Sequence, residues 1–145
     1  MIHELLYRSR ANSDLTTEDV LDILKTSQEF NFKHNITGCL LYFDKEFIQI
    51  LEGDEQTIKS LYSKIKEDYR HTNVNLLLEN DKTERIFKNW SMAFKEISKE
   101  DMNNIDKILI VNNFIISAEL DYKSMKASKL FFYLAKEPFR KLLKI

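Results

Sequence analysis

This chain of 145 residues contains one cysteine, one proline and two glycines. Its single thiol, Cys39, cannot form an internal disulfide, which agrees with a reducing compartment. The sequence has no cysteine and histidine cluster at zinc-ligand spacing and no glycine-rich phosphate loop. The histidines, His3, His34 and His71, are too scattered to suggest a metal site, so we expect no bound metal.

Long hydrophobic runs are also missing. No apolar stretch approaches the roughly 20 residues of a membrane-spanning helix. The first residues, Met1 to Glu4, lack the basic start and the cleavage site of a signal peptide. With 43% hydrophobic and 31% charged residues, the composition is that of one globular domain. These features predict a cytoplasmic protein with no membrane partner.

Charge is unevenly divided, although the net charge is −1. Residues 122–145 carry seven basic side chains and one acidic side chain, a net charge of +6, which leaves −7 on residues 1–121. The acidic part should repel nucleic acid. The basic tail either binds an anionic partner or forms a solvated helix face.

Two β-prone runs flank the turn Asp44–Glu46 and predict an antiparallel hairpin. Gly38 lies inside the first run, where a glycine marks a bulge or the close approach of another group. Gln49 is a polar residue among the apolar residues of the second run. If it is buried it needs hydrogen-bond partners, and a polar ligand is one candidate. From the hairpin alone, a solvated face of an edge strand is the simpler interpretation.

The other patterns complete the order β-α-β-β-α-β-β. A strand over residues 2–8 precedes a helix that Thr16 caps and that runs to about residue 30. Asp54 caps a second helix, and further strands cover residues 74–78 and 90–94. This order predicts a ferredoxin-like α+β fold with both helices on one face of the sheet. We expect the first strand to be central and to neighbour the strand that follows the first helix.

Helical patterns continue through residues 98–145, which we interpret as a C-terminal helical extension and not as a second domain. The helix that begins near Asp101 is expected to cover the open face of the sheet. The basic last helix would then stay available for a partner or a second copy of the chain, with its apolar residues Phe131, Phe132, Leu134 and Phe139.

Short motifs recur in a characteristic order over about residues 1–95. They are Tyr7 with Ser9, Ser27-Gln28 with Asn31, Asn35 to Gly38, Phe47 to Gly53, Asp68 to His71, and Trp90 to Met92. In order and spacing they resemble the blue-light-using-flavin (BLUF) photoreceptor family. The resemblance implies a flavin-binding sensor domain over residues 1–97. It also implies a non-covalent flavin, FAD or else FMN or riboflavin, held between the two helices against the sheet.

The resemblance assigns photochemical roles to residues that would otherwise be ordinary strand residues. Tyr7 matches the electron and proton donor, and Gln49 matches the amide between that tyrosine and the flavin. Trp90 and Met92 match a signal-relay pair on the fifth strand. Without the motif, a half-buried strand tyrosine and core packing of Trp90 and Met92 are the default interpretations.

Cofactor contacts are implied in the same way. The matching residues are Tyr7, Ser27, Asn31, Gln49, Arg70 and His71. Asn31 would hold the polar edge of the flavin, and Arg70 and His71 would contact phosphate or ribose. Arg70 and His71 also follow a helix, where basic residues complement the helix dipole.

The sequence departs from the family pattern around Asn31. Asn35 stands where a glycine commonly precedes Ile-Thr-Gly, and Phe30 and Phe32 flank Asn31 where more polar residues are frequent. These departures concern the environment of the ring edge and not the presence of the flavin.

The sequence therefore predicts a photoreceptor that is not an enzyme, forms a homo-oligomer and signals to a separate protein. The alternative is a ferredoxin-like flavoenzyme or metabolite-binding domain without a photocycle. Tyr7, Gln49 and Asn31 suit the holding of hydrogen bonds and leave little room for a substrate, which favours the sensor. Deletion of residues 122–145 is expected to keep the absorption shift and to alter self-association or partner binding.

Overall fold

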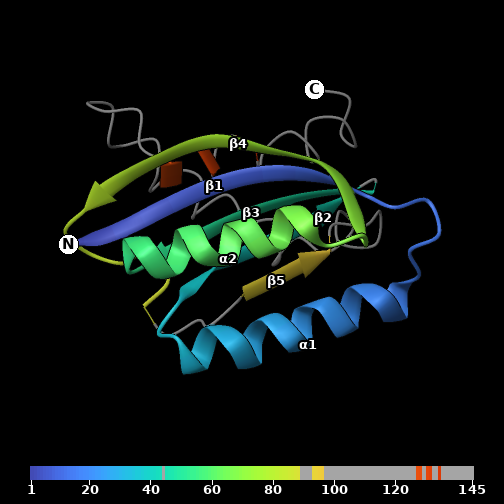
Figure 1. The fold of residues 1–145 in the computed structure, drawn as a ribbon, viewed down its shortest axis with the longest axis horizontal. Coiled ribbons are helices and arrows are strands. Elements are labelled where there is room, and N and C mark those ends of the chain that lie inside the picture. The colour runs from blue at the N-terminus through green and yellow to red at the C-terminus, as the bar shows by residue number, and fades with distance from the viewer. Residues whose placement is uncertain (44, 89–92, 97–126, 129, 132–133, 135–145) are drawn as a thin grey trace, which may run out of the picture.

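The computed structural model describes residues 1–43, 45–88, 93–96, 127–128, 130–131 and 134. In chain order, and as drawn in Figure 1, the elements are β1 (Ile2–Ala11), α1 (Thr17–Lys33), β2 (Thr37–Phe43), β3 (Glu46–Gly53), α2 (Glu55–Glu67), β4 (His71–Lys82) and β5 (Ala93–Glu96). The sequence predicts this order of strands and helices. Within the described residues, no helix has the length and apolar content needed to span a membrane.

The strands form one sheet in the order β4-β1-β3-β2-β5. Neighbouring strands are antiparallel except β2 and β5, which are parallel. The first strand was predicted to be central; it lies inside the sheet, and its neighbours are β3 and β4. The expectation that it neighbours β2, the strand after the first helix, is wrong. The crossover from β1 to β2 leaves a gap one strand wide, and β3 turns back into that gap. The fold is α+β and ferredoxin-like.

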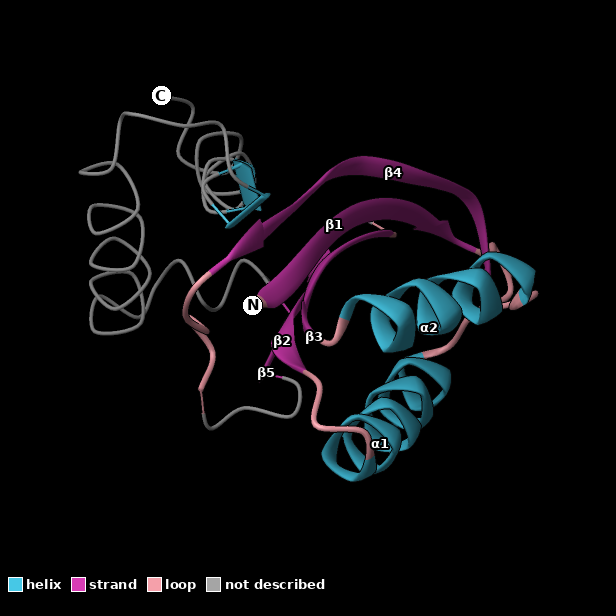
Figure 2. Cartoon of the chain, turned by 60° about the vertical axis from the view of Figure 1, so that its left-hand side comes forward, coloured by secondary structure: helices cyan, strands magenta, loops and turns pink. Residues whose placement is uncertain are grey.

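Both helices cover the same face of the sheet (Figure 2), and each begins at its predicted cap. Thr16 Oγ1 accepts a hydrogen bond from the N–H of Asp19 at 3.2 Å, and Asp19 Oδ2 accepts one from the N–H of Thr16 at 2.9 Å. Asp54 Oδ2 accepts a hydrogen bond from the N–H of Thr57 at 3.1 Å. These contacts satisfy N–H groups that have no partner inside the helix.

The lengths of the strands differ from the sequence prediction more than the starts of the helices do. β1 extends to residue 11 and β4 covers residues 71–82 instead of 74–78. β4 pairs with β1 along almost its whole length, so pairing and not intrinsic β propensity sets its extent. Of the predicted fifth strand, residues 93 and 94 lie in β5, whereas residues 90–92 lie outside the described residues.

Each face of the sheet carries its own apolar core. On the helix face, Leu5 and Leu51 pack with Val20 of α1 and Ile58 of α2. The opposite face, called the back face below, carries a cluster made of Leu6, Leu41, Ile48, Ile50, Phe87, Ala127, Phe131 and Leu134. C-terminal residues therefore cover the back face.

This arrangement corrects the prediction that the last helix stays available for a partner. Phe131 is 2% exposed and Leu134 is 9% exposed, because both pack against the apolar side chains of the back face. The helix predicted to begin near Asp101, and residues 132 and 139, lie outside the described residues.

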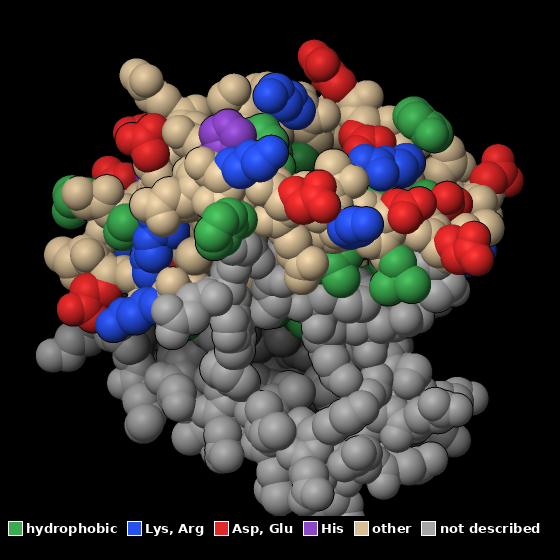
Figure 3. Space-filling model, turned by 90° about the horizontal axis from the view of Figure 1, so that it is seen from below, with side chains coloured by type: hydrophobic (Ala, Val, Ile, Leu, Met, Phe, Trp, Pro, Cys, Tyr) green, Lys and Arg blue, Asp and Glu red, His purple; other side chains and the backbone are tan. Residues whose placement is uncertain are grey.

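The face shown in Figure 3 carries acidic and basic side chains side by side. Among the residues that the structure describes, the acidic side chains are therefore not gathered into one patch on this face. Any repulsion of nucleic acid there would come from the summed charge.

His3 is 5% exposed and lies between two carboxylates. Its Nδ1 is 2.8 Å from Asp81 Oδ1 and its Nε2 is 3.0 Å from Glu79 Oε2. Ligand atoms of His3, Asp81 and Glu55 lie within 4.8 Å of one another, a grouping that the scattered sequence positions did not suggest. Burial opposes the charge of His3, but the hydrogen bonds to Asp81 and Glu79 outweigh it and raise the pKa above 6.5.

We expect His3 to make stability depend on pH. A raised folded-state pKa means that the charged ring stabilises the fold fully below pH 6.5. This contribution is lost as the pH rises through the raised pKa. The difference in unfolding free energy between wild type and His3→Gln, measured in urea, should therefore shrink from about pH 6 to about pH 9. A constant difference over that range would contradict the assignment.

Candidate functional site

A cavity of ≈ 250 Å³ lies between the two helices and the sheet. Its apolar lining consists of Ile23, Phe30, Leu40, Phe47, Leu61 and Ile65. Its polar and charged lining consists of Tyr7, Thr26, Ser27, Asn31, Gln49, Lys64, Asp68, Arg70 and His71. All six residues that the sequence analysis proposed as cofactor contacts line this one cavity.

Tyr7 and Gln49 form the centre of the polar lining. They are directly opposed on β1 and β3, and they are 3% and 4% exposed. The Tyr7 hydroxyl donates a hydrogen bond to Gln49 Oε1. Burial raises the pKa of Tyr7 above its ordinary value of 10, so the phenol keeps its proton and acts as the donor. The interpretation of Gln49 as a solvated residue on an edge strand is wrong, because β3 lies inside the sheet.

Ser27 and Asn31 lie four residues apart on α1, so both reach the cavity from one face of the helix. Asn31 is fully buried. Its backbone carbonyl accepts hydrogen bonds from the N–H groups of Ile36 at 2.9 Å and His34 at 3.2 Å. These bonds fix the end of the helix, and with it the position of the Asn31 side chain.

The two departures from the family pattern have different consequences. Asn35 has φ of 55°, in the left-handed region that glycine and asparagine adopt most readily, so asparagine can replace glycine there. Phe32 is 79% exposed and does not line the cavity. Phe30 does line it, with its ring stacked on His34 at a centroid distance of 3.9 Å. Only Phe30 therefore changes the surroundings of the cavity.

Arg70 and His71 lie beside the cavity but have protein partners. Arg70 Nη2 is 2.6 Å from Asp68 Oδ2, and its Nε donates to Asp68 Oδ1 at 3.0 Å. The hydrogen bond from Arg70 holds the pKa of Asp68 below its usual value. His71 Nε2 donates to the carbonyl of Ile65 at 2.8 Å, and its Nδ1 lies 2.9 Å from Ser9 Oγ. His71 thus ties the end of α2 to β1.

The donor set fits a flavin. A planar apolar ring suits the slot lined by Phe30, Leu40 and Ile65, and amides and a phenol suit the polar edge of such a ring. Lys64 and Arg70 place positive charge on the lining, which suits the phosphate groups of FAD or FMN.

Three polar or charged lining residues were not among the six predicted cofactor contacts: Thr26, Lys64 and Asp68. Lys64 Nζ lies 5.2 Å from the centroid of the Phe30 ring, and Asp68 orients Arg70. The sequence offered a signal for Asp68, because its carboxylate lies only two positions before the basic Arg70. Trp90 and Met92 lie outside the described residues. Cys39 packs on the back face, where burial raises the pKa of its thiol to about 12, so it plays no part in the cavity.

Comparison with known proteins gives consistent matches. Residues 2–93 match the family model named BLUF and described as "Sensors of blue-light using FAD". Over 90 residues the chain is 33% identical to "Photoactivated adenylate cyclase subunit beta" of Euglena gracilis, covering 61% of this chain and 10% of that protein. Over 105 residues it is 28% identical to "Blue light- and temperature-regulated antirepressor BluF" of Escherichia coli (strain K12), covering 72% of this chain and 26% of that protein.

Among solved structures, "BlsA ground state" is similar, with a TM-score of 0.69 and 26% identity over 94% of this chain and 87% of that chain. The two curated relatives are much longer than the region they share with this chain. Because the family match covers residues 2–93, from β1 to the first residue of β5, the chain belongs to the BLUF family, whose members sense blue light with FAD.

Proposed function

We propose that the Tyr7–Gln49 hydrogen bond is the photochemical switch of this blue-light sensor. The observation that carries the proposal is the buried bond itself, in which the Tyr7 hydroxyl donates to Gln49 Oε1 beside the cavity. Absorption of blue light and the uptake of an electron are the chemistry that bound FAD supplies. Tyr7 holds the proton that moves, and Gln49 Oε1 is the atom positioned to receive it.

Rotation of the Gln49 amide would exchange its two ends. In the present orientation Oε1 faces Tyr7 and accepts its proton. After rotation Nε2 would face Tyr7, whose oxygen would then accept and not donate. Both arrangements keep a hydrogen bond between Tyr7 and Gln49, so the two states can lie close in energy and a small input can exchange them.

The other lining residues would hold the cofactor. Asn31 and Ser27 present polar groups from α1, and Arg70, although paired with Asp68, keeps a positive charge on the lining for a phosphate. His71 has both ring nitrogens engaged, so we propose that it positions α2 and shapes the cavity beside the flavin.

We further propose that the chain has no catalytic activity of its own and signals in the cytoplasm to a separate protein, as part of a homo-oligomer. Trp90 and Met92 remain the proposed relay. The names of the relatives support this division of labour, since one is an antirepressor and another a cyclase subunit. In both, the matched region is a small share of a longer protein.

A direct test is the colour and light response of the purified chain. We expect a yellow protein whose flavin band shifts to the red under blue light and returns in darkness. Difference spectra and mass spectrometry of the released flavin would measure the shift and distinguish FAD from FMN and riboflavin. A colourless protein that none of these flavins reconstitutes, or a bound flavin without a reversible shift, would contradict the proposal.

A further inference from the structure

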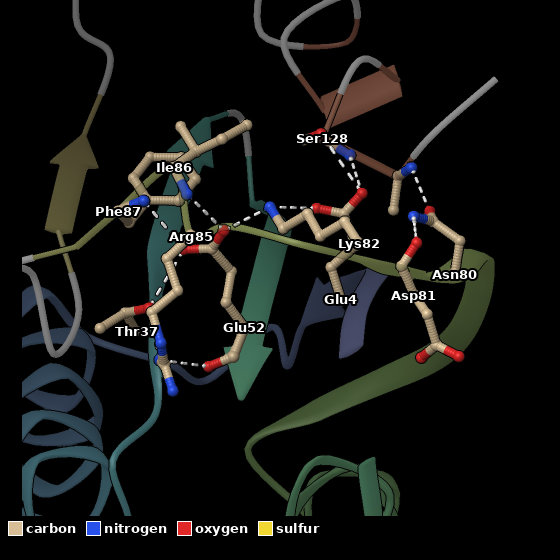
Figure 4. Close-up of polar contacts among 11 residues, drawn as sticks. Glu4, Thr37, Glu52, Asn80, Asp81, Lys82, Arg85, Ile86, Phe87 and Ser128 are labelled. Atoms are coloured by element: carbon tan, nitrogen blue, oxygen red, sulfur yellow. Dashed lines mark hydrogen bonds and ion pairs between the residues drawn. The ribbon is translucent and has the colours of Figure 1, made fainter. Parts of the chain in front are cut away.

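A network of buried charges lies on the back face of the sheet (Figure 4). Glu4 and Glu52 are fully buried, and Lys82 is 7% exposed. The Lys82 ammonium group lies 2.6 Å from Glu4 Oε2 and also contacts Glu52 Oε2. Two carboxylates, one from β1 and one from β3, therefore share one lysine from β4. Such a group is costly to bury unless further hydrogen bonds satisfy it.

Glu52 finds these further bonds within the sheet domain. Its carboxylate accepts hydrogen bonds from Thr37 Oγ1 at 3.1 Å and from the N–H groups of Ile86 at 2.7 Å and Phe87 at 2.8 Å. Glu52 thus anchors the chain that follows β4.

Glu4 is the corresponding anchor for the C-terminal residues. Its Oε1 accepts hydrogen bonds from the N–H of Ser128 at 3.1 Å and from the Ser128 hydroxyl at 3.3 Å. Asn80 Oδ1 accepts one from the N–H of Ala127 at 2.8 Å. Side chains of β1 and β4 therefore hold two backbone N–H groups of this helical stretch. If residues 127 and 128 left the sheet, Glu4 would lose both hydrogen bonds from Ser128. Glu52 would keep its hydrogen bonds from Thr37, Ile86 and Phe87.

The two carboxylates of the network lie on the same two strands, β1 and β3, as Tyr7 and Gln49 of the switch. On the β1–β3 ladder Glu4 is paired with Glu52, and three positions further along Tyr7 is paired with Gln49. Because side chains alternate along a strand, one pair faces the back and the other faces the cavity. Lys82 bridges the two strands, so a change in their spacing or twist changes its contact with Glu4.

We propose that Glu4, held by Lys82, is a positioning residue that couples the Tyr7–Gln49 switch to the docking of residues 127, 128, 130, 131 and 134. The inference rests on the proposed function, because rearrangement of Gln49 is its input. Movement of β3 against β1 draws Lys82 away from Glu4 and weakens the bonds from Glu4 to Ser128. Phe131 and Leu134 are then released from the back face.

Hydrogen–deuterium exchange of a peptide spanning residues 127–134, in the flavin-bound full chain, tests the coupling. In the wild type, exchange should rise about tenfold under blue light, the change expected for loss of a hydrogen bond to a charged group. Glu4→Gln keeps the size of the side chain and removes its charge. Its exchange should already be raised about tenfold in darkness, and the light–dark difference should disappear. The red shift should persist, because the cavity lies on the other face.

Glu46→Gln is the matched control. It removes a carboxylate from the far end of the same ladder, where Glu46 binds Arg8 at 2.8 Å, and should leave the exchange of residues 127–134 unchanged. Ser128→Ala removes only the hydroxyl donor and should raise dark exchange less than Glu4→Gln does. If Glu4→Gln fails to fold, Ser128→Ala tests the coupling in its place. Unchanged dark exchange of residues 127–134 in Ser128→Ala would then overturn the coupling.

The outcomes separate this inference from the proposed function. A wild-type chain that shows no red shift contradicts the function itself. A normal red shift without a light response at residues 127–134 overturns the coupling alone. An intact light response at these residues in Glu4→Gln overturns it as well.

Discussion

Replacing Tyr7 with phenylalanine is expected to abolish the light-induced red shift while the flavin stays bound. The variant keeps the ring that lines the cavity and removes only the hydroxyl that donates to Gln49 Oε1. Without the hydroxyl, the Tyr7–Gln49 hydrogen bond that the proposed switch rearranges is lost. Difference spectra under blue light would measure the shift, and the ratio of flavin to protein absorbance would measure occupancy.

Tyr62→Phe is the matched control for this experiment. Tyr62 is also buried, at 9% exposed, and its ring centroid lies 5.6 Å from that of Tyr7, but it does not line the cavity. Its red shift should match the wild type. Gln49→Leu should lose the normal shift, as Tyr7→Phe does. A normal photocycle in Tyr7→Phe or Gln49→Leu would show that the proposed switch is wrong.

Local chemistry explains which parts of the fold could be predicted from the sequence. Thr16 and Asp54 begin their helices because their side chains satisfy N–H groups only three residues away. The length of β4 could not be predicted in the same way. Its residues are half exposed and mixed in character, and they become a strand because β1 lies beside them.

The candidate site was predictable only as a set. Tyr7, Asn31 and Gln49 each have an ordinary interpretation alone, and the shared motif gave them a common one. Their meeting depends on β3 lying between β1 and β2, a topology that the sequence analysis described incorrectly. The roles of the three residues could still be assigned without the correct strand order. Members of one family share the same strand pairing, so residues at matching sequence positions occupy matching places in the sheet.

The buried charges on the back face were beyond sequence reasoning. Glu4, Glu52 and Lys82 are common surface residue types, separated by 48 and 30 positions, and nothing in their neighbours marks them as buried. Glu4 is bonded by the chain near position 128, and Glu52 by the chain that follows β4, so both carboxylates depend on segments distant in the sequence. The cover of the back face by C-terminal residues explains why the expectation of an available last helix failed.

The glycine at position 38 has a large expected effect on stability. A Cβ at this position would lie 2.0 Å from the carbonyl oxygen of Ile50 and 3.1 Å from its carbon. Because both atoms belong to the backbone of β3, no side-chain rotation relieves the contact, and the two strands must separate. We expect Gly38→Ala to lower the unfolding free energy by about 3 kcal/mol, at the upper end of overpacking effects, as measured by urea denaturation.

Gly53→Ala is the internal control, because it adds the same methyl group to the other glycine of the chain. Its nearest contacts, the Asn35 carbonyl oxygen and Ile58 Cδ1, would be at 3.4 Å, an ordinary van der Waals distance. The unfolding free energy should therefore change by about 1 kcal/mol or less. Equal losses of unfolding free energy in the two variants would mean that the close approach of β3 to Gly38 does not cause the destabilisation.

Gly38→Ala should also weaken the light response, since β2 pairs Gly38 with Leu51 and the following cavity-facing residue, Leu40, with Gln49. Displacing β3 at Ile50 moves the amide next to it, so the packing of one glycine bears directly on the geometry of the switch.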